Sequence, residues 1–376
     1  MQEVAGMRRL AWMIFAGAVM ALTGCSGFFV PVVPVPPGST GNFAYVANSV
    51  TSSVSGFSVG TGTLSAVPNS PIPLAYTPLA MVVTPNNKFL YVAAPGNINV
   101  YTINSDGSLA SASGGTGVAI ANVVSMDVSP DGKWLLALEG TTLLAQVDTF
   151  QIDASTGALA SASPTQVAIP NAVIIPTMLR ISPNGLLVFA AMGSAGDLVF
   201  TFDTSTGALV SSQKLAVATT SSDNGLAVDS ATTTLYIARS GTGGGVRVFK
   251  IGAAGALNEI SGSPFASGGQ AYSVALDSTG KYVYAANRLN GTIYGYSIGT
   301  GGVLTALGGS PYASGALVTS LGIDTSGKYL LAAAFGGGPD LSMYSFDTAT
   351  PGKLVLATST ATGTDPTGAV AVALTH

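Results

Sequence analysis

The sequence predicts an all-β protein whose four-stranded antiparallel sheets close into a ring, a seven-bladed β-propeller. Three observations support this prediction: a short apolar phrase recurs seven times, its copies are almost evenly spaced, and no helical periodicity occurs after residue 41. With 47% hydrophobic and 8% charged residues, the chain can bury a large core. The net charge of −4 offers no basic surface to a phosphate backbone, which argues against a nucleic-acid-binding protein.

The recurring phrase has five residues and is rich in Tyr, Val, Leu and Ala. Its copies read FAYVA at residue 43, FLYVA at 89, WLLAL at 134, LVFAA at 187, TLYIA at 234, YVYAA at 282 and YLLAA at 329. Successive copies are 46, 45, 53, 47, 48 and 47 residues apart. A period of this length is typical of repeat architectures such as propellers.

Each repeat carries the signals of four strands. An apolar run such as Ser273–Asp277 predicts a buried inner strand, and a turn such as Ser129–Lys133 follows it, where Gly accepts a positive φ. The recurring phrase is the second strand, and a further turn such as Asn104–Leu109 separates the third strand from the outer one. The third strand carries an aromatic residue in fixed register: Phe57, Tyr101, Phe150, Phe200, Phe249, Tyr296 and Tyr344. A single sheet of this kind leaves apolar faces in water, so we expect the seven sheets to pack face to face around an axis.

The two ends of the repeat region complement each other. No copy of the inner strand precedes Phe43, whereas one follows the seventh outer strand at Pro366–Leu374. We therefore expect the C-terminal strand to join the blade formed by residues 43–76. Such sharing closes the ring and removes a free sheet edge.

The N-terminal residues have the pattern of an export signal. Arg8 and Arg9 precede an apolar core of 13 residues, Leu10–Leu22, which is too short to span a membrane as a helix. Leu22-Thr23-Gly24-Cys25 follows and resembles the lipobox of bacterial lipoproteins, and Cys25 is the only cysteine in the sequence. A plain secretory signal and an uncleaved membrane anchor are the alternatives.

These features predict three parts of the chain. Residues 1–24 form a lipoprotein signal peptide, residues 25–41 comprise the lipidated Cys25 and a proline-rich tether, and residues 42–376 form the propeller. The serine after Cys25 favours the outer membrane, on its periplasmic or surface side. We expect a monomer that meets the membrane through its lipid.

The phrases YVAN at Tyr45–Asn48 and YVYAAN at Tyr282–Asn287, the SPDGK turn and the seven-fold period resemble the lactonase family of propellers, also called YVTN-repeat propellers. The resemblance covers residues 43–376. It implies the seven-bladed fold, and it implies an activity like that of the family's 6-phosphogluconolactonase, a carboxylic ester hydrolase. The matching residues are strand and turn residues, so the resemblance itself transfers no catalytic residue.

Candidate site residues follow the recurring phrase, where the loops of a propeller converge around the central channel. The first residue after the phrase varies between repeats: Asn48, Ala94, Glu139, Met192, Arg239, Asn287 and Ala334. With Arg288, the charged and amide members of this set predict a mouth in which Arg forks bind a carboxylate or phosphate. Glu139, Arg239 and Arg288 are the candidates for catalysis, and Asn48 and Asn287 for ligand binding. The alternative is that these are solvated loop residues, with the Asn side chains capping turns.

A second pair of candidates lies in the inner strands. Two neighbouring blades carry Asp127 and Arg180 at a position that is otherwise Val, Ala or Gly. A lone buried charge is costly, so we expect an ion pair between adjacent blades near the channel. Such a pair either sets the blade packing or contributes to ligand binding or catalysis.

Familiar catalytic patterns are scarce. The only histidine is His376, so a Ser-His-Asp triad would require the C-terminus to enter the mouth. The GxSxG strings at Gly56–Gly60 and Gly295–Gly299 fall on third strands, whereas a nucleophile elbow joins a strand to a helix. No zinc motif, calcium loop or P-loop is present in the sequence, so we expect neither a metal nor a cofactor.

Three functions remain open. The first is a lipid-anchored module that binds a small molecule, a glycan or a protein at the top face of the propeller. The second is a lactone hydrolase in which an Arg polarises the ring carbonyl and Glu139 or Asp127 activates water. The third is a structural or adhesion protein of the cell envelope. Whether the protein is an enzyme is not decided by its sequence.

Overall fold

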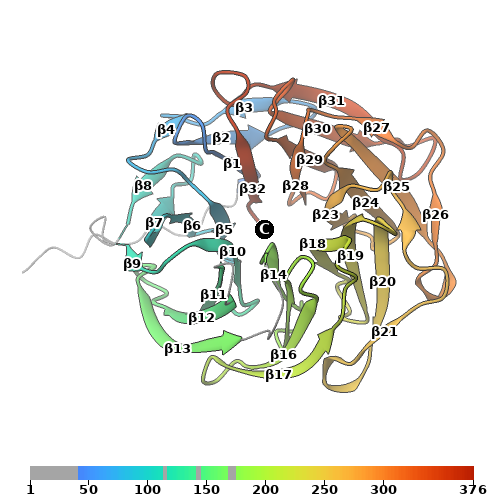
Figure 1. Ribbon diagram of the computed structural model, residues 1–376. Helices are drawn as coiled ribbons and strands as arrows, with labels where there is room; N and C mark the ends of the chain where they lie inside the picture. The colour runs from blue at the N-terminus through green and yellow to red at the C-terminus, as the bar shows by residue number, and fades with distance from the viewer. Residues whose placement is uncertain (1–40, 113–116, 141–144, 168–174) are drawn as a thin grey trace, which may run out of the picture. The chain divides into compact units, whose positions relative to one another are not determined.

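The computed structural model describes residues 41–112, 117–140, 145–167 and 175–376. Within these ranges the chain forms seven antiparallel sheets arranged around one axis (Figure 1). The innermost strands contact one another in an unbroken cycle, which confirms the seven-bladed propeller. The predicted signal peptide, residues 1–24, and Cys25 lie outside the described residues.

Each blade runs from an inner strand beside the axis to an outer strand at the periphery. The inner strands are β5 (Ala80–Val83), β10 (Val123–Val128), β14 (Met178–Ile181), β18 (Ser221–Val228), β23 (Ala271–Leu276), β28 (Val318–Ile323) and β32 (Ala369–Leu374). The second strands are β1 (Phe43–Asn48), β6 (Phe89–Ala94), β11 (Trp134–Gly140), β15 (Leu187–Ala191), β19 (Thr234–Gly241), β24 (Tyr282–Asn287) and β29 (Tyr329–Ala334). The third strands are β2 (Ser53–Val59), β7 (Asn97–Ile103), β12 (Ala145–Ile152), β16 (Asp197–Asp203), β20 (Gly245–Ile251), β25 (Thr292–Ile298) and β30 (Leu341–Phe346).

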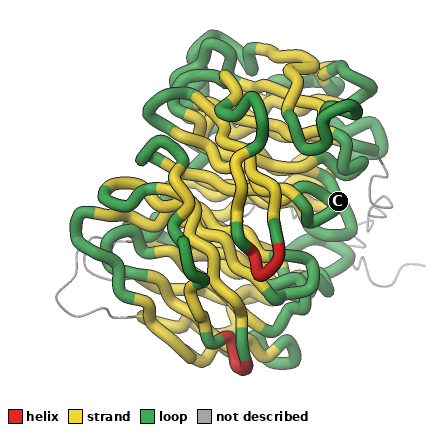
Figure 2. The backbone as a smooth tube through the Cα atoms, turned by 90° about the vertical axis from the view of Figure 1, so that its right-hand side faces the viewer, coloured by secondary structure: helices red, strands yellow, loops and turns green. Residues whose placement is uncertain are grey.

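The outer strands are of two kinds. Three are continuous, namely β13 (Leu159–Val167), β17 (Ala208–Leu215) and β31 (Leu354–Thr360). In the other four blades the outer edge consists of two short pieces that pair with the same third strand: β3 (Leu64–Ala66) with β4 (Ile72–Pro73), β8 (Leu109–Ser111) with β9 (Val118–Ala119), β21 (Leu257–Glu259) with β22 (Phe265–Ala266), and β26 (Leu304–Ala306) with β27 (Tyr312–Ala313). Helix in the described ranges is limited to the single turns η2 (Ala253–Gly255) and η3 (Thr300–Gly302), which Figure 2 shows in red.

The hydrophobic core lies between the blades. The buried apolar side chains divide into seven clusters in the described chain, and each cluster combines residues of two successive blades. In β24, Val283 and Ala285 face the preceding blade while Tyr284 and Ala286 face the next one. This alternation explains why the recurring phrase is apolar throughout: the second strand is buried on both faces.

At three blades of the described chain, the Tyr in the middle of the recurring phrase fastens its blade to the next. The hydroxyl of Tyr91 donates a 2.9 Å hydrogen bond to the carbonyl oxygen of Gly157, in the turn between the third and outer strands of the next blade. The same contact joins Tyr45 to Gly107 at 2.8 Å and Tyr284 to Gly352 at 2.6 Å. A glycine is required at these turns because φ is positive and because the backbone lies flat on an aromatic ring. In these three blades the repeat thus preserves both partners of one contact, the Tyr hydroxyl and the turn glycine.

The remaining fold predictions are also confirmed. The seven third-strand aromatics occupy the same register, each opposite the second residue of the neighbouring strand. β32 pairs with β1, with Leu374 opposite Ala44, so the C-terminal strand closes the ring. In the predicted turn at Ser129–Lys133, the hydroxyl of Ser129 donates to Asp131 at 2.6 Å and Gly132 has a φ of 72°.

Candidate functional site

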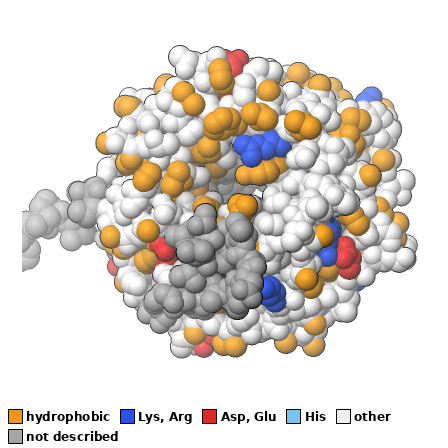
Figure 3. Space-filling model, in the orientation of Figure 1, with side chains coloured by type: hydrophobic (Ala, Val, Ile, Leu, Met, Phe, Trp, Pro, Cys, Tyr) orange, Lys and Arg blue, Asp and Glu red, His pale blue; other side chains and the backbone are white. Residues whose placement is uncertain are grey.

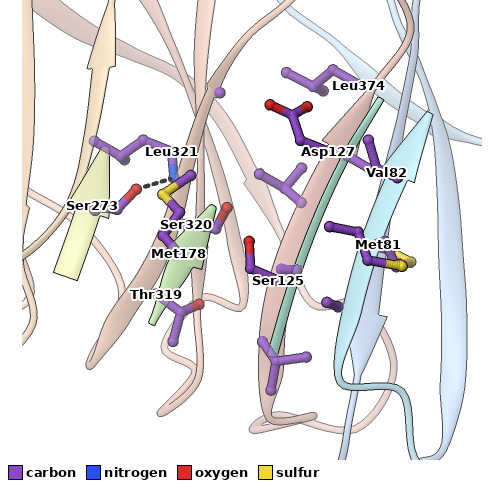
Figure 4. Close-up of a pocket in the computed structure, with 18 of the residues that line it drawn as sticks. Met81, Val82, Ser125, Asp127, Met178, Ser273, Thr319, Ser320, Leu321 and Leu374 are labelled. Carbon is purple, nitrogen blue, oxygen red and sulfur yellow. Dashed lines mark hydrogen bonds between the residues drawn. The ribbon is translucent and has the colours of Figure 1, made fainter. Parts of the chain in front are cut away.

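A cavity of about 550 Å³ lies along the propeller axis and is lined mainly by the inner strands. Figure 3 shows the opening at its upper end, the end at which the loops between second and third strands emerge. Basic and hydrophobic side chains lie around this opening. Figure 4 shows side chains of three inner strands around the cavity: Ser125 and Asp127 of β10, Thr319 of β28 and Met81 of β5.

Many polar side chains of the wall already serve the backbone. The hydroxyl oxygen of Ser125 accepts a hydrogen bond from Leu179 N at 3.0 Å, and that of Ser273 accepts one from Leu321 N at 3.1 Å, the contact dashed in Figure 4. An inner strand has no ladder partner on its axial side, so these side chains of the preceding blade satisfy N–H groups that would otherwise be unpaired. Polar lining alone is therefore weak support for ligand binding.

Asp127 and Arg180 form the ion pair that the sequence predicts between adjacent blades. Nη1 of Arg180 lies 3.5 Å from Oδ2 of Asp127, and the same oxygen accepts a 2.8 Å hydrogen bond from Ile181 N. The Asp127 side chain is 12% exposed and that of Arg180 39%. The carboxylate is thus held by the backbone of the next blade, and the Arg180 side chain also lines the cavity.

Arg288 and Tyr272 line the upper part of the same cavity. The guanidinium carbon of Arg288 lies 4.7 Å from the centre of the Tyr272 ring, and this cation–π contact fixes the position of the charge along the cavity. None of the ion pairs found between described residues includes Arg288. The ring therefore holds the guanidinium group in place, and no described carboxylate neutralises its charge.

The other predicted mouth residues do not line this cavity. Arg239 is engaged by Asp223 through two hydrogen bonds, of 2.6 Å from Nε and 2.8 Å from Nη2. Glu139 lies near the C-terminal end of β11. Burial, followed by the charge of Asp148, raises the pKa of its carboxyl group. The structure therefore does not gather Glu139, Arg239 and Arg288 into one mouth.

Asn48 and Asn287 are fully buried and brace loops. Nδ2 of Asn48 donates to Ser55 Oγ at 2.9 Å, and its Oδ1 accepts from Thr362 Oγ1 at 2.8 Å, which links the first and last blades. Asn287 donates to the carbonyl oxygen of Ser267 at 2.8 Å and accepts from Asn290 N at 3.2 Å. Their contacts correspond to the capping alternative.

His376 lies at the opposite end of the cavity from Arg288. Its backbone N donates to Asn87 Oδ1 at 2.8 Å, and its ring Nε2 lies 3.3 Å from the carbonyl oxygen of Val83, at the end of β5. Among the described residues no serine hydroxyl is hydrogen-bonded to this ring, and no group of His, Cys, Asp and Glu is arranged to hold a metal ion.

Sequence reasoning missed the ring of residues that shapes the upper cavity. In five blades the pairing of the inner strand shifts by one residue near its start, a β-bulge. The shift turns one side chain per blade toward the cavity: Val124, Asn224, Tyr272, Thr319 and Val370. Bulges are common next to binding sites because they re-aim side chains in this way. A bulge has no distinct sequence signal, so regular alternation assigns these residues to the wrong face.

In the part of the chain that the structure describes, no helix is long and apolar enough to cross a membrane.

The sequence matches one known family. The profile of the family described as "Lactonase, 7-bladed beta-propeller" matches residues 35–177 and 190–307. No curated protein matches the chain significantly by sequence.

Solved structures share the fold at low identity. A candidate 6-phosphogluconolactonase of Bacteroides uniformis superposes with a TM-score of 0.73 at 19% identity, over 89% of this chain and 99% of that one. The periplasmic gluconolactonase of Pseudomonas aeruginosa gives 0.72 at 15% identity, over 89% and 99%. Kuenenia stuttgartiensis hydrazine synthase gives 0.64 at 17% identity, over 87% and 99%. Proteins with such different names share this architecture, so the likeness shows the fold and no activity.

Proposed function

Because the chain belongs to the lactonase family of seven-bladed β-propellers, we propose that it is a ligand-binding propeller of the cell envelope. Its ligand is a small molecule with an anionic group, and it binds in the central cavity beside Arg288 and Arg180. The observation that carries this proposal is the unpaired charge of Arg288 in the upper cavity, since none of the ion pairs between described residues includes it. Asp127, the one acidic side chain of the lining, pairs with Arg180, so Arg288 remains available to an anionic ligand.

The size and lining of the cavity support a small molecule. Its volume of about 550 Å³ falls in the range of about 300–1,000 Å³ usual for ligand sites. Guanidinium groups bind carboxylates and phosphates through paired N–H donors, and such charge-assisted bonds are stronger than neutral ones. The hydroxyl of Ser320 can meet a hydroxyl group of the ligand, and the oxygen of Thr319, which already donates to Ala369 O, can accept from one.

We propose further that the protein is exported and held by a lipid on Cys25. The predicted signal and the periplasmic relative support an extracytoplasmic location. Asn42, near the start of the described propeller, donates to Asp324 Oδ2 at 2.6 Å, in the turn that joins β28 to β29. This turn lies at the face opposite the loop that carries Arg288, so the described chain enters the propeller at the end away from the cavity mouth.

Calorimetric titration of the full-length protein with gluconate and with 6-phosphogluconate tests the binding proposal. We expect Arg288→Gln and Arg180→Gln each to weaken binding about 10- to 100-fold, since a hydrogen bond to a charged group contributes about 1.5–3 kcal/mol. Lys133→Gln is the control, because Lys133 is an exposed turn residue whose side chain is 68% exposed. Binding that is equally strong in all three variants contradicts a site in the cavity.

A lactone hydrolase is the second candidate, and the contact between Asp127 and Arg180 in the cavity favours it. The carboxylate could activate water while a guanidinium stabilises the developing oxyanion. Hydrolysis of glucono-1,5-lactone should then be lost in Asp127→Asn and reduced in Arg288→Ala. Glu139→Gln discriminates the two carboxylates: loss of turnover in that variant alone would move the reaction to the top of β11. No turnover by the unmodified protein leaves the binding proposal in place.

A further inference from the structure

A buried ionic cluster lies between blades four and five, outside the cavity. It combines Asp197 at the start of β16, Asp223 in β18, Arg239 in β19, Arg247 in β20 and Glu259 at the end of β21. Asp223 is completely buried, and the side chains of Asp197 and Arg247 are 4% and 7% exposed. Its position on two blades makes the cluster part of the contact between them.

Both guanidinium groups are engaged mainly by carboxylates other than Asp197. Arg239 forms its two-bond fork with Asp223, and Arg247 forms a second fork with Glu259, of 3.0 Å from Nε and 2.7 Å from Nη2. The remaining Nη1 of Arg247 lies 2.8 Å from Asp223 Oδ2 and 3.4 Å from Asp197 Oδ2. Arg247 also stacks on Phe249, with 4.4 Å from its guanidinium carbon to the ring centre, so it has little freedom to move toward Asp197.

Asp197 is left over in this arrangement. With every group ionised, three carboxylates face two guanidinium groups. Oδ1 of Asp197 is buried and has no hydrogen-bond partner among the described residues, and its Oδ2 has only the long contact with Arg247. An ionised carboxylate that is buried and poorly paired is strongly unfavourable, whereas its neutral form makes the charges of the cluster balance.

We propose that Asp197 binds a proton at neutral pH, donates it in a hydrogen bond to Asp223, and thereby makes the contact between blades four and five sensitive to pH. Burial, followed by the charge of Asp223, raises the pKa of Asp197 well above its usual range, against the opposing effect of Arg247 and Arg239. For Asp223, burial acts in the same direction, but hydrogen bonds from Arg239 and Asp197 outweigh it and lower the pKa. Asp223 accepts the two-bond fork of Arg239 and a further bond from Arg247, so its ionised form is the better stabilised of the two and the proton resides on Asp197.

The sign of the pH dependence follows from the raised pKa. Between the pKa of Asp197 in the unfolded chain, about 3.9, and its higher value in the fold, the native state holds one more proton than the unfolded state. Stability therefore falls as pH rises, and the equilibrium constant of unfolding increases about tenfold per pH unit for this proton. Glu139 and Asp148 also have raised pKa values, so the contribution of Asp197 appears as a difference between two proteins.

Urea unfolding of the full-length protein and of Asp197→Asn between pH 5 and 8 tests the proposal. The amide can donate to Asp223 as the acid does, so the variant should fold and should lack the change of about tenfold per pH unit. The matched control is Asp148→Asn, which removes another carboxyl of raised pKa and should keep the slope from Asp197. Parallel pH curves for the unmodified protein and Asp197→Asn would overturn the proposal.

An infrared measurement keeps the test decisive if Asp197→Asn folds poorly. The unmodified protein at pH 7 should show the C=O stretching band of a protonated carboxylic acid. The band should persist in Asp148→Asn and be lost in Asp223→Asn, where ionised Asp197 and Glu259 balance the charges of Arg239 and Arg247. Absence of the band at pH 7 in the unmodified protein refutes a neutral Asp197, whatever the stability of the variants.

Discussion

Replacing Gly157 with alanine tests whether the flat contact between turn and aromatic ring holds successive blades together. A Cβ atom at Gly157 would lie 2.7 Å from Cδ1 of Phe89, which is buried at 1% exposure. The carbonyl oxygen of Gly157 also accepts the 2.9 Å hydrogen bond from Tyr91. Relief of the clash must therefore move either a core ring or the turn that Tyr91 binds.

Gly132→Ala is a matched control for this change. Gly132 and Gly157 both have a φ of 72° in tight turns, but an added Cβ at Gly132 meets nothing within 4 Å. The left-handed conformation alone costs about 1 kcal/mol for alanine, partly offset by the lower entropy of the unfolded chain. Overpacking adds about 1–3 kcal/mol at Gly157, so we expect a total of about 2–4 kcal/mol there.

Urea denaturation measures the difference between the two variants. With a slope near 3 kcal/mol per M, the midpoint should fall by about 0.3 M for Gly132→Ala and by about 0.7–1.3 M for Gly157→Ala. The double variant Phe89→Leu/Gly157→Ala should lose less than the sum of its single changes, because the smaller side chain makes room for the added methyl group. Equal midpoints for the two glycine variants would refute the reasoning.

Three other predictions address the cavity wall, the ring closure and the anchor. Asp127→Ala should lower the free energy of unfolding by about 1–3 kcal/mol, because Ile181 N loses its buried acceptor. Arg180→Ala should lower it by at most about 1 kcal/mol, because the ion pair is partly exposed. If chemical denaturation gives the reverse order, the ion pair and not the backbone contact dominates. Asn48→Ala should cost about 1–3 kcal/mol by the same assay, since it removes the buried link between the first and last blades, and a neutral result would contradict that role. Cys25→Ala should move the protein from the membrane fraction to the soluble fraction and abolish incorporation of labelled palmitate; unchanged fractionation would contradict the lipid anchor.

The fold could be predicted because each element of the repeat has a local cause. Val283 and Tyr284 face opposite sides of their strand, and both are apolar, which indicates a strand buried on both faces. The glycine in a turn indicates a positive φ. Both signals are present within a single repeat and recur along the chain. The pair of Asp127 and Arg180 could also be predicted, since both residues interrupt an otherwise apolar position in neighbouring repeats.

The upper cavity could not be predicted to the same degree. The bulge that turns Tyr272 toward Arg288 depends on pairing between strands and leaves no mark in the sequence. The partner of Arg239 was missed for a related reason, because Asp223 lies 16 residues away and meets it only through strand register. Arg247 did carry a readable signal: alternation places it on the same buried face as Phe249, which requires a nearby carboxylate.

The distinction between structural and functional polar groups follows from the geometry of the inner strands. Such strands pair on one side only, so their N–H groups facing the preceding blade need acceptors, and Ser125, Asp127 and Ser273 supply them. Backbone N–H groups need acceptors, and a guanidinium offers only donors. The fold thus accounts for the hydroxyl and carboxyl groups of the wall, and the charge of Asp127 accounts for Arg180. Arg288 is required neither by the backbone nor by a described carboxylate, and the anionic ligand that we propose would supply its partner.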